Sequence, residues 1–319
     1  MHSVEFKDNK LIIVDQRKLP HNEEFVICET VEQTADAIRN MTVRGAPAIG
    51  VAAAYGMVFA TDLNEAAKTL KAARPTAVDL TNAVDYVLLE CSKGLDANTA
   101  AKKWHQTIIE KTKKICENGA GLIKDGDSIL LHCNTGPVAT AAYGTALGAV
   151  IFAKKQGKRI SAYVDETRPR FQGALTSWEL LKAEVSHKVI TDSMTGMLMK
   201  DKKINCVMVG ADRIVKNGDF ANKIGTYSLA ILAKAHKIPF YVFAPLSTFD
   251  FTLRNGKKIR IEERNEQEIL EIEGKRIYPK NAQAFNPAFD ITPAKYVTSY
   301  ITEFGVYKTV KEIDTHGRV

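Results

Sequence analysis

Cys133 stands in surroundings that suit a reactive side chain. It lies in the segment LLHCNTGPVA, residues 130–139, between an apolar run and a polar turn that contains glycine. A cysteine placed after a strand and before a helix faces the positive end of the helix dipole, which stabilises a thiolate. Buried cysteine is also a common packing residue. Position alone therefore leaves Cys133 open between chemistry and packing.

His132 precedes this cysteine directly in the sequence. Neighbouring side chains of an extended segment point to opposite sides, so the imidazole would point away from the thiol. We therefore interpret His132 as a core histidine whose hydrogen bonds are satisfied by its surroundings, and not as a base for Cys133.

Asp212 follows an apolar run in the stretch VGADR. Burial after a strand raises the pKa of a carboxyl by desolvation, and such a carboxyl can serve as a general acid near neutral pH. The alternative is a structural role, as a helix N-cap or in a salt bridge with Arg213. Two further carboxylates, Asp165 and Glu166, lie close in sequence to arginines, and for them we favour a structural ion-pair network.

The stretch RGAPA, residues 44–48, precedes a run of small residues that predicts a helix. Backbone N–H groups at a helix start and an arginine guanidinium together form an anion site, and phosphate is its natural ligand. The alternative is a tight turn with a solvated arginine. Asn222 and Lys223 follow a glycine turn and would open a second helix with a charged donor. No Walker-type motif is present, which disfavours a nucleoside triphosphate.

Composition narrows the class of protein. The 319 residues carry a formal net charge of +7, with 45% hydrophobic and 25% charged residues, as in an ordinary globular protein. No run approaches the roughly 18 apolar residues of a membrane helix, and the N-terminus lacks the apolar region of a signal peptide. We therefore expect a cytoplasmic protein with no membrane partner. The lysines form no basic stripe, so we expect an anionic small substrate and no nucleic-acid partner.

Cofactor motifs are missing as well. The five cysteines include no C-x-x-C pair, so we expect reduced thiols and no metal site. No G-x-G-x-x-G follows the first strand of the C-terminal half, so dinucleotide binding is not supported. We expect no cofactor. Acid/base chemistry by a cysteine and an aspartate on a small phosphorylated metabolite is then the simplest interpretation.

The secondary-structure elements predicted to position these residues indicate an α/β protein of two domains. Residues 1–120 predict an α-rich N-terminal domain, because helix-length amphipathic patterns dominate it. It begins with a small antiparallel sheet over residues 4–30, where apolar and polar residues alternate. Thr30 and Gln33 form a capping box for the helix that follows.

Residues 121–319 predict a Rossmann-like domain with a parallel sheet. Short apolar runs alternate there with helix-length segments, the pattern of strands covered on both faces. Strands are predicted at 128–131, 160–164, 189–191, 206–209 and 240–243, and helices at 138–156, 172–185, 193–200 and 222–236. Ligands of such sheets bind beyond the carboxyl ends of the strands. Cys133 and Asp212 both lie in polar segments that directly follow a predicted strand.

Motifs along the whole chain resemble those of the methylthioribose-1-phosphate isomerases. That family shares its fold with the regulatory α, β and δ subunits of translation initiation factor 2B. The matching stretches are VRGAPAIGVAAAYG at 43–56, RPTAV at 74–78, HCNTG at 132–136, ATAAYGTALG at 139–148, DETRPRFQG at 165–173, VGADRI at 209–214, NGDFANKIGTY at 217–227 and FDITP at 289–293. They run nearly end to end, so the resemblance covers both predicted domains.

The resemblance implies which residues act on the substrate. The catalytic cysteine and aspartate of the family fall on Cys133 and Asp212. Its substrate and phosphate contacts fall on Arg44, Gly45, Ala46, Arg74, Gln172, Asn222 and Lys223. The sequence departs from the family pattern at Asp79, where asparagine is common, and after Ala174, where an arginine is missing. Both changes concern the pocket for the group at C5 of the sugar.

The activity that the resemblance implies is an aldose–ketose isomerisation. The substrate would be S-methyl-5-thioribose 1-phosphate, in methionine salvage, and the protein a homodimer. One alternative is a sister isomerase for 5-deoxyribose 1-phosphate or ribose 1,5-bisphosphate, although a bisphosphate would need a second arginine cluster that is not obvious here. Another is a non-catalytic regulatory protein like the initiation-factor subunits, which lack the full catalytic pair.

Overall fold

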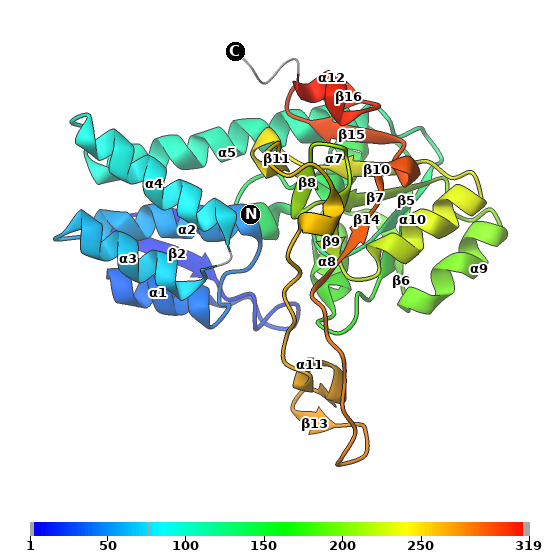
Figure 1. Ribbon diagram of the computed structural model, residues 1–319, viewed down its shortest axis with the longest axis horizontal. Helices are drawn as coiled ribbons and strands as arrows, with labels where there is room; N and C mark the ends of the chain where they lie inside the picture. Colours follow the sequence, from blue (N-terminus) through cyan, green and yellow to red (C-terminus); the bar gives the residue numbers. More distant parts are fainter. Residues whose placement is uncertain (1–2, 76, 315–319) are drawn as a thin grey trace. The chain divides into compact units, whose positions relative to one another are not determined.

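A computed structural model describes residues 3–75 and 77–314, and the predicted α/β fold class is confirmed (Figure 1). The chain divides into two compact units, Met1–Lys114 with Thr135–Gly148 and Ile115–Asn134 with Ala149–Val319. The domain boundary at residue 120 stays a prediction, and the contacts add that residues 135–148 pack with the N-terminal unit. Among the described residues, no helix has the length and apolar character needed to cross a membrane.

The first unit begins with the predicted antiparallel sheet. Three of its strands pair in sequence order: β1 (Val4–Lys7), β2 (Lys10–Val14) and β3 (Phe25–Cys28). Thr30 caps α1 (Val31–Arg39), because its hydroxyl accepts a hydrogen bond from the N–H of Gln33. The side chain of Gln33 accepts the N–H of Glu29, one residue before the cap. The capping signal therefore located this helix start correctly.

Helices make up most of the rest of the first unit. They are α2 (Ala46–Gly56), η1 (Met57–Phe59), α3 (Leu63–Ala73), α4 (Val78–Ser92), α5 (Ala97–Ala120), whose last turns belong to the second unit, and α6 (Pro137–Thr140). α2 is built from small residues and is buried from Ala48 onward. A Cβ on Gly50 would lie 2.9 Å from the carbonyl oxygen of Asp79 in α4, so glycine allows the two helices to pack closely.

The single helix predicted over 138–156 is in fact two helices, α6 and α7 (Ala146–Lys155). Ala141 and Gly144 adopt φ angles of +56° and +87°, which end the first helix. The hydroxyl of Thr140 accepts a hydrogen bond from the N–H of Gly144 and closes the turn. Periodicity missed this break because the segment consists of small residues without a proline after its first turn.

Within the described residues, seven strands form the main sheet of the second unit, in the order β16-β15-β10-β7-β4-β5-β6. Neighbours from β15 to β6 are parallel, and β16 is antiparallel at the edge. The strands are β4 (Ser128–Leu131), β5 (Ser161–Asp165), β6 (Ser186–Ile190), β7 (Cys206–Gly210), β10 (Phe240–Phe243), β15 (Ser299–Thr302) and β16 (Gly305–Tyr307). The Rossmann-like pattern is confirmed, and four of the predicted strands agree within one residue at each end. The strand predicted at 189–191 corresponds to β6, which begins three residues earlier and ends at Ile190.

A smaller sheet in the second unit has the order β11-β8-β9-β14. Its strands are β8 (Arg213–Val215), β9 (Phe220–Lys223), β11 (Phe249–Asp250) and β14 (Phe289–Thr292). The prediction that Asn222 and Lys223 open a helix is therefore wrong. β9 lies between β8 and β14, so its backbone groups pair with strands on both sides, and α10 (Thr226–Ala235) begins after it.

The remaining elements are mostly short. They are α8 (Gln172–Lys182), η2 (Asp192–Met194), α9 (Thr195–Lys200), η3 (Leu246–Thr248), η4 (Gly256–Lys258), α11 (Gln267–Leu270), β12 (Glu271–Ile272), β13 (Lys275–Arg276), η5 (Ala294–Tyr296) and α12 (Val310–Asp314). The segment with α11 and β13 projects as a narrow arm from the second unit (Figure 1).

The two faces of the main sheet pack against different helices. Phe240 and Val242 of β10 belong to one core cluster with residues of α9 and α10. Phe243 points to the opposite face, because side chains alternate along a strand. There it meets the last turn of α5 so closely that a Cβ on Gly119 would lie 2.2 Å from its Cε1 atom. The close packing of the last turn of α5 on the sheet therefore depends on this glycine.

Because Phe243 lies so close to Gly119, one methyl group added at residue 119 should have a large effect on stability. Gly119→Ala should lower the free energy of unfolding by about 1–3 kcal/mol through overpacking, as measured by chemical denaturation. Gly121→Ala is the control, because its nearest contact would be 3.4 Å from the added Cβ. Equal stability of the two variants would contradict the packing described for α5.

Candidate functional site

Cys133 and Asp212 follow two neighbouring strands of the main sheet. β4 and β7 pair in parallel, with Leu131 opposite Met208, so both strands end at the same edge. After β4 the chain builds β5 and β6 on one side, whereas β7, β10 and β15 lie on the other. Where the strand order reverses, a doubly wound sheet opens a crevice in which ligands bind. The two predicted catalytic residues therefore stand at this switch point.

The backbone of Cys133 is strained and firmly held. Its φ angle is +63°, in the left-handed region that costs a residue with a side chain roughly 1–3 kcal/mol. Its N–H donates to the hydroxyl of Thr167 at 2.9 Å, and its carbonyl accepts from the hydroxyl of Thr176 at 2.8 Å. A cysteine that merely fills the core needs no such conformation. Supported strain is typical of functional sites, so it favours chemistry over packing for Cys133.

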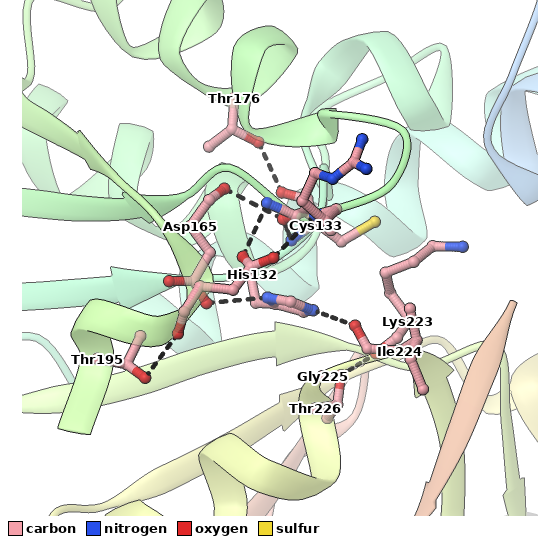
Figure 2. A network of polar contacts seen from close by, with 12 residues as sticks. His132, Cys133, Asp165, Thr176, Thr195, Lys223, Ile224, Gly225 and Thr226 are labelled. Atoms are coloured by element: carbon pink, nitrogen blue, oxygen red, sulfur yellow. Dashed lines mark hydrogen bonds and ion pairs between the residues drawn. The ribbon is translucent and has the colours of Figure 1, made fainter. Parts of the chain in front are cut away.

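The imidazole of His132 is buried, and each of its ring nitrogens contacts an oxygen atom (Figure 2). Nδ1 lies 2.9 Å from Oδ2 of Asp165, and Nε2 lies 2.9 Å from the carbonyl oxygen of Ile224. Because a carbonyl oxygen accepts and never donates, Nε2 carries a hydrogen. The predicted satisfied core histidine is confirmed. The ion-pair network predicted for Asp165 with nearby arginines is wrong, since Asp165 pairs with this histidine.

Burial controls the charge of this pair. Desolvation raises the pKa of Asp165 to about 6, against the opposing effect of His132. Desolvation also disfavours protonation of His132, but the hydrogen bond and the charge of Asp165 outweigh it and raise the pKa of the imidazole. The pair therefore holds a proton more firmly than the separate groups would in water. Oδ1 of Asp165 is buried without a hydrogen-bond partner among the described residues, which also disfavours a fully charged carboxylate.

Asp192 lies beside this pair. One ligand atom each of His132, Asp165 and Asp192 lies within 4.8 Å of the others, a spacing that a single metal ion can bridge. However, both imidazole nitrogens are already hydrogen-bonded, and the two oxygens of Asp192 accept the N–H groups of Thr167 and Arg168. A histidine ligand must offer a free lone pair. We therefore interpret the three residues as a hydrogen-bond network, which borders a cavity of about 480 Å³.

Asp212 is exposed, in the bend between β7 and β8. This corrects the expectation of a desolvated carboxyl, because the chain leaves the core two residues after the strand ends. Asp212 precedes a strand, so it is not a helix N-cap either. Its N–H donates to the carbonyl of Ala221 on β9 at 2.9 Å. The neighbouring Arg213 pairs with Asp250, with 3.3 Å between Nη1 and Oδ2.

Asn222 and Lys223 end β9 and enter a tight turn. The hydroxyl of Thr226 donates to the carbonyl of Lys223 at 2.6 Å and accepts from Nδ2 of Asn222 at 2.9 Å. Nζ of Lys223 donates to the carbonyl of Ala288 at 3.1 Å and lies 4.5 Å from the ring centre of Phe289. The backbone of both predicted contact residues is thus held in place by the turn itself.

Asp290 closes the same turn from β14. Its carboxylate accepts the N–H groups of Gly225 at 2.8 Å and Tyr227 at 3.0 Å, at the start of α10. Burial raises the pKa of Asp290 to about 6, although these two donors oppose the shift. Gly225 has a φ angle of +103°, which favours glycine at this position. The turn is therefore fixed by the carboxylate of Asp290 on β14 and by the imidazole of His132, which follows β4.

Gln172 and Asn134 each carry a side-chain oxygen that has no partner among the described residues. Gln172 begins α8, and its Oε1 atom is buried with no hydrogen bond among the described residues. Asn134 donates through Nδ2 to Thr176 at 3.1 Å and to Glu179 at 2.7 Å, yet its Oδ1 atom is equally unpaired. A buried unpaired acceptor costs roughly 1–3 kcal/mol. Both atoms suit the hydroxyl donors of a sugar.

The other predicted phosphate contacts lie in the first unit, which leaves their role a prediction. Nη2 of Arg44 donates to the carbonyl of Gln16 at 3.0 Å, and Nε2 of Gln16 donates to the carbonyl of Arg44 at 3.0 Å. Gly45 has a φ angle of +96°, and a Cβ there would lie 2.2 Å from a carbonyl oxygen of α6. α2 begins at the exposed Ala46, and Arg74 follows α3 directly.

Residues that support the site escaped the sequence analysis. Thr176 holds Cys133 through a single hydroxyl group outside the matched stretches, and a lone threonine forms no recognisable pattern. Thr167, by contrast, stands in the DETRPRFQG stretch that already matched the family motifs. Gln16 holds Arg44 from a distant segment for which the sequence offers no spacing rule. Asp290 stands in the FDITP stretch that already matched the family motifs, so a signal for it was present.

Comparison with known sequences agrees with this geometry. Residues 42–309 match the Initiation factor 2 subunit family. A methylthioribose-1-phosphate isomerase from Thermotoga neapolitana is 50% identical, over 96% of this chain and 94% of the relative. One from Dehalococcoides mccartyi is 47% identical, over 97% of this chain and 98% of the relative.

Two solved structures that are described by different names share this fold. 5-Methylthioribose 1-phosphate isomerase from Pyrococcus horikoshii superimposes with a TM-score of 0.91 and 38% identity, covering 99% of this chain and 96% of that one. A structure described as translation initiation factor eIF-2B, subunit delta, from A. fulgidus has a TM-score of 0.89 and 41% identity, covering 98% and 99%. This chain belongs to the initiation factor 2 subunit family.

Proposed function

We propose that this protein is an aldose–ketose isomerase that converts S-methyl-5-thioribose 1-phosphate to S-methyl-5-thioribulose 1-phosphate. Relatives named for this enzyme, about half identical over nearly the whole length of both chains, support it. The observation that carries the proposal is the placement of Cys133, in a strained and well-held conformation, and of Asp212 after two neighbouring strands at the switch point of the sheet. The cytoplasmic location and the homodimer stay predictions.

The phosphate on C1 dictates the first step. An aldose 1-phosphate is locked as a ring and has no free aldehyde, so the site must open the ring itself. Asp212 donates a proton to the ring oxygen as the bond between that oxygen and C1 breaks. The exposed carboxyl must be protonated for this step. A bound sugar that covers it, together with the negative phosphate, favours the protonated form.

The second step moves hydrogen from C2 to C1 and leaves a carbonyl at C2. In a hydride route, the hydrogen and its electron pair move directly, and the thiolate of Cys133 accepts the proton of the C2 hydroxyl. In a proton route, the thiolate removes the hydrogen of C2 as a proton and the resulting thiol returns a proton to C1 of the enediol. The C2 hydroxyl then gives its own proton to the Asp212 carboxylate as the carbonyl at C2 forms. Each route releases one proton and the ring oxygen has gained one, so the product is an isomer of the substrate.

The regulatory class is the second candidate, because one similar structure is described as an initiation-factor subunit. A protein that only binds partners has no use for a strained cysteine at the end of one strand and a carboxylate after the neighbouring strand, at a ligand crevice. The unpaired oxygens of Gln172 and Asn134 likewise suit a small polar ligand. These observations favour the enzyme.

Turnover of candidate sugars tests the proposed function. Proton NMR of the purified protein should show methylthioribose 1-phosphate converted faster than 5-deoxyribose 1-phosphate, with ribose 1,5-bisphosphate slowest. The same reaction in D₂O separates the routes, since deuterium enters C1 in the proton route and not in the hydride route. Absence of turnover with all three sugars would reject the isomerase.

Removal of either proposed catalytic group should abolish chemistry while the substrate still binds. Cys133→Ser and Asp212→Asn should each lower kcat by at least about a hundredfold, with a much smaller change in KM. Cys91→Ser and Asp201→Asn are matched controls on α4 and after α9, and they should behave like the wild type. Near-normal kcat in Cys133→Ser or Asp212→Asn would remove that residue from the mechanism.

Gln172→Leu should separate stability from activity. Leucine removes a buried oxygen that has no partner, so the free energy of unfolding should rise by up to about 1–3 kcal/mol. Loss of the acceptor should lower kcat/KM by about tenfold or more through KM. The exposed Gln156→Leu is the control and should leave kcat/KM unchanged. A Gln172→Leu enzyme with normal KM would mean that Oε1 does not meet the substrate.

A further inference from the structure

A continuous path joins the two proposed catalytic residues within the second unit. The N–H of Asp212 donates to the carbonyl of Ala221 on β9. β9 runs on through Lys223 to Ile224, whose carbonyl lies 2.9 Å from Nε2 of His132. Cys133 is the next residue after His132. Figure 2 shows the imidazole lying between Asp165 and Ile224.

The turn after β9 also packs directly on the imidazole. A Cβ on Gly225 would lie 3.0 Å from Cε1 and 3.2 Å from Nε2 of His132. The histidine is 2% exposed, so water does not compete for its hydrogen bonds. The ring is buried, has both nitrogens hydrogen-bonded and lies close to the backbone of the turn. It therefore restricts where the turn can lie.

We propose that His132 is a positioning residue whose Nε2–H group fixes the carbonyl of Ile224 and thereby holds Lys223 and Asp212 in place relative to Cys133. This inference rests on the proposed isomerase activity. His132 touches neither substrate nor reacting atoms in this account, and it acts through the turn. Asp165 orients the ring by engaging Nδ1, as a carboxylate commonly does for a working histidine.

The proton of the pair makes this support depend on pH. The carboxylates that act on the imidazole are Asp165 from β5, Asp192 from η2 and Asp290 from β14, and Glu166 acts on Asp165. The pKa of His132 is raised above the ordinary 6.5, so its contribution to stability is fully present below about pH 6.5. It is lost as the pH rises through the folded-state pKa. Substitution of His132 by an amide should remove this part of the pH dependence.

Two amide substitutions separate positioning from simple structural support. In His132→Gln the amide nitrogen takes the place of Nε2 and can still donate to Ile224. In His132→Asn it takes the place of Nδ1 and keeps the contact with Asp165 instead. We expect His132→Gln to retain kcat/KM within about tenfold, and His132→Asn to lose about a hundredfold, mainly in kcat, because misplacement by about 1 Å has that effect.

Measurements without substrate make the test independent of turnover. Backbone amide NMR should show large shifts of Lys223 and Gly225 in His132→Asn and small ones in His132→Gln, while thermal unfolding reports stability separately. Equal losses of activity in the two variants, following their stability, would overturn the inference, as would unchanged Lys223 and Gly225 signals in His132→Asn. If the wild type turns over no sugar, the proposed function fails, and the amide signals still decide the role of His132.

Discussion

The buried contact of His132 with Asp165 and Ile224 is the interaction on which the candidate site depends. It ties together the end of β4, the end of β5 and the turn after β9, which are far apart in the sequence. Removal of one partner would leave a buried polar group without a hydrogen bond, which costs more than the bond contributes when made. The large penalty for breaking the network keeps the three segments in one arrangement. Asp290 strengthens it by closing the same turn from β14.

Several features of the candidate site cost stability in the ligand-free protein, and a bound sugar would explain why they are retained. Cys133 has a left-handed backbone, and Gln172 and Asn134 each bury an oxygen that has no partner within the part of the chain that the structure describes. Natural proteins tolerate such local costs where function requires them. The hydroxyl groups of a sugar phosphate would donate to these two oxygens. Its C1 and C2 atoms, where the reaction takes place, would lie at the Cys133 thiol. The same substrate would cover Asp212, which is exposed here.

The sequence predicted the large features well because they depend on local patterns. Alternating apolar runs and helix-length segments located the strands of the main sheet, and Thr30 marked a helix start. Predictions failed where tertiary contacts override the local pattern. Asn222 and Lys223 look like a helix start but lie on strand β9 and pair with β14, and a turn at Ala141 splits an expected helix.

The site was predicted less completely for the same reason. Cys133 and Asp212 could be singled out as candidates because each follows an apolar strand, and the family resemblance then assigned them as the catalytic pair. The contacts that hold the site could not be predicted, since the hydroxyls of Thr167 and Thr176 on Cys133 and the carbonyl of Ile224 on His132 are single groups brought together by the fold. Asp165 was misassigned because arginines are near it in sequence, while its actual partner, His132, is 33 residues away. The exposure of Asp212 depends on how the chain bends after β7.

A crystal structure of Cys133→Ser with bound methylthioribose 1-phosphate tests the central claim most directly. The account predicts C1 and C2 of the sugar between residue 133 and Asp212, the ring oxygen within hydrogen-bond distance of Asp212, a sugar hydroxyl on Oε1 of Gln172, and an unbroken contact between His132 and Ile224. A sugar bound in the cavity beside Asp192, with Asp212 still in solvent, would contradict it.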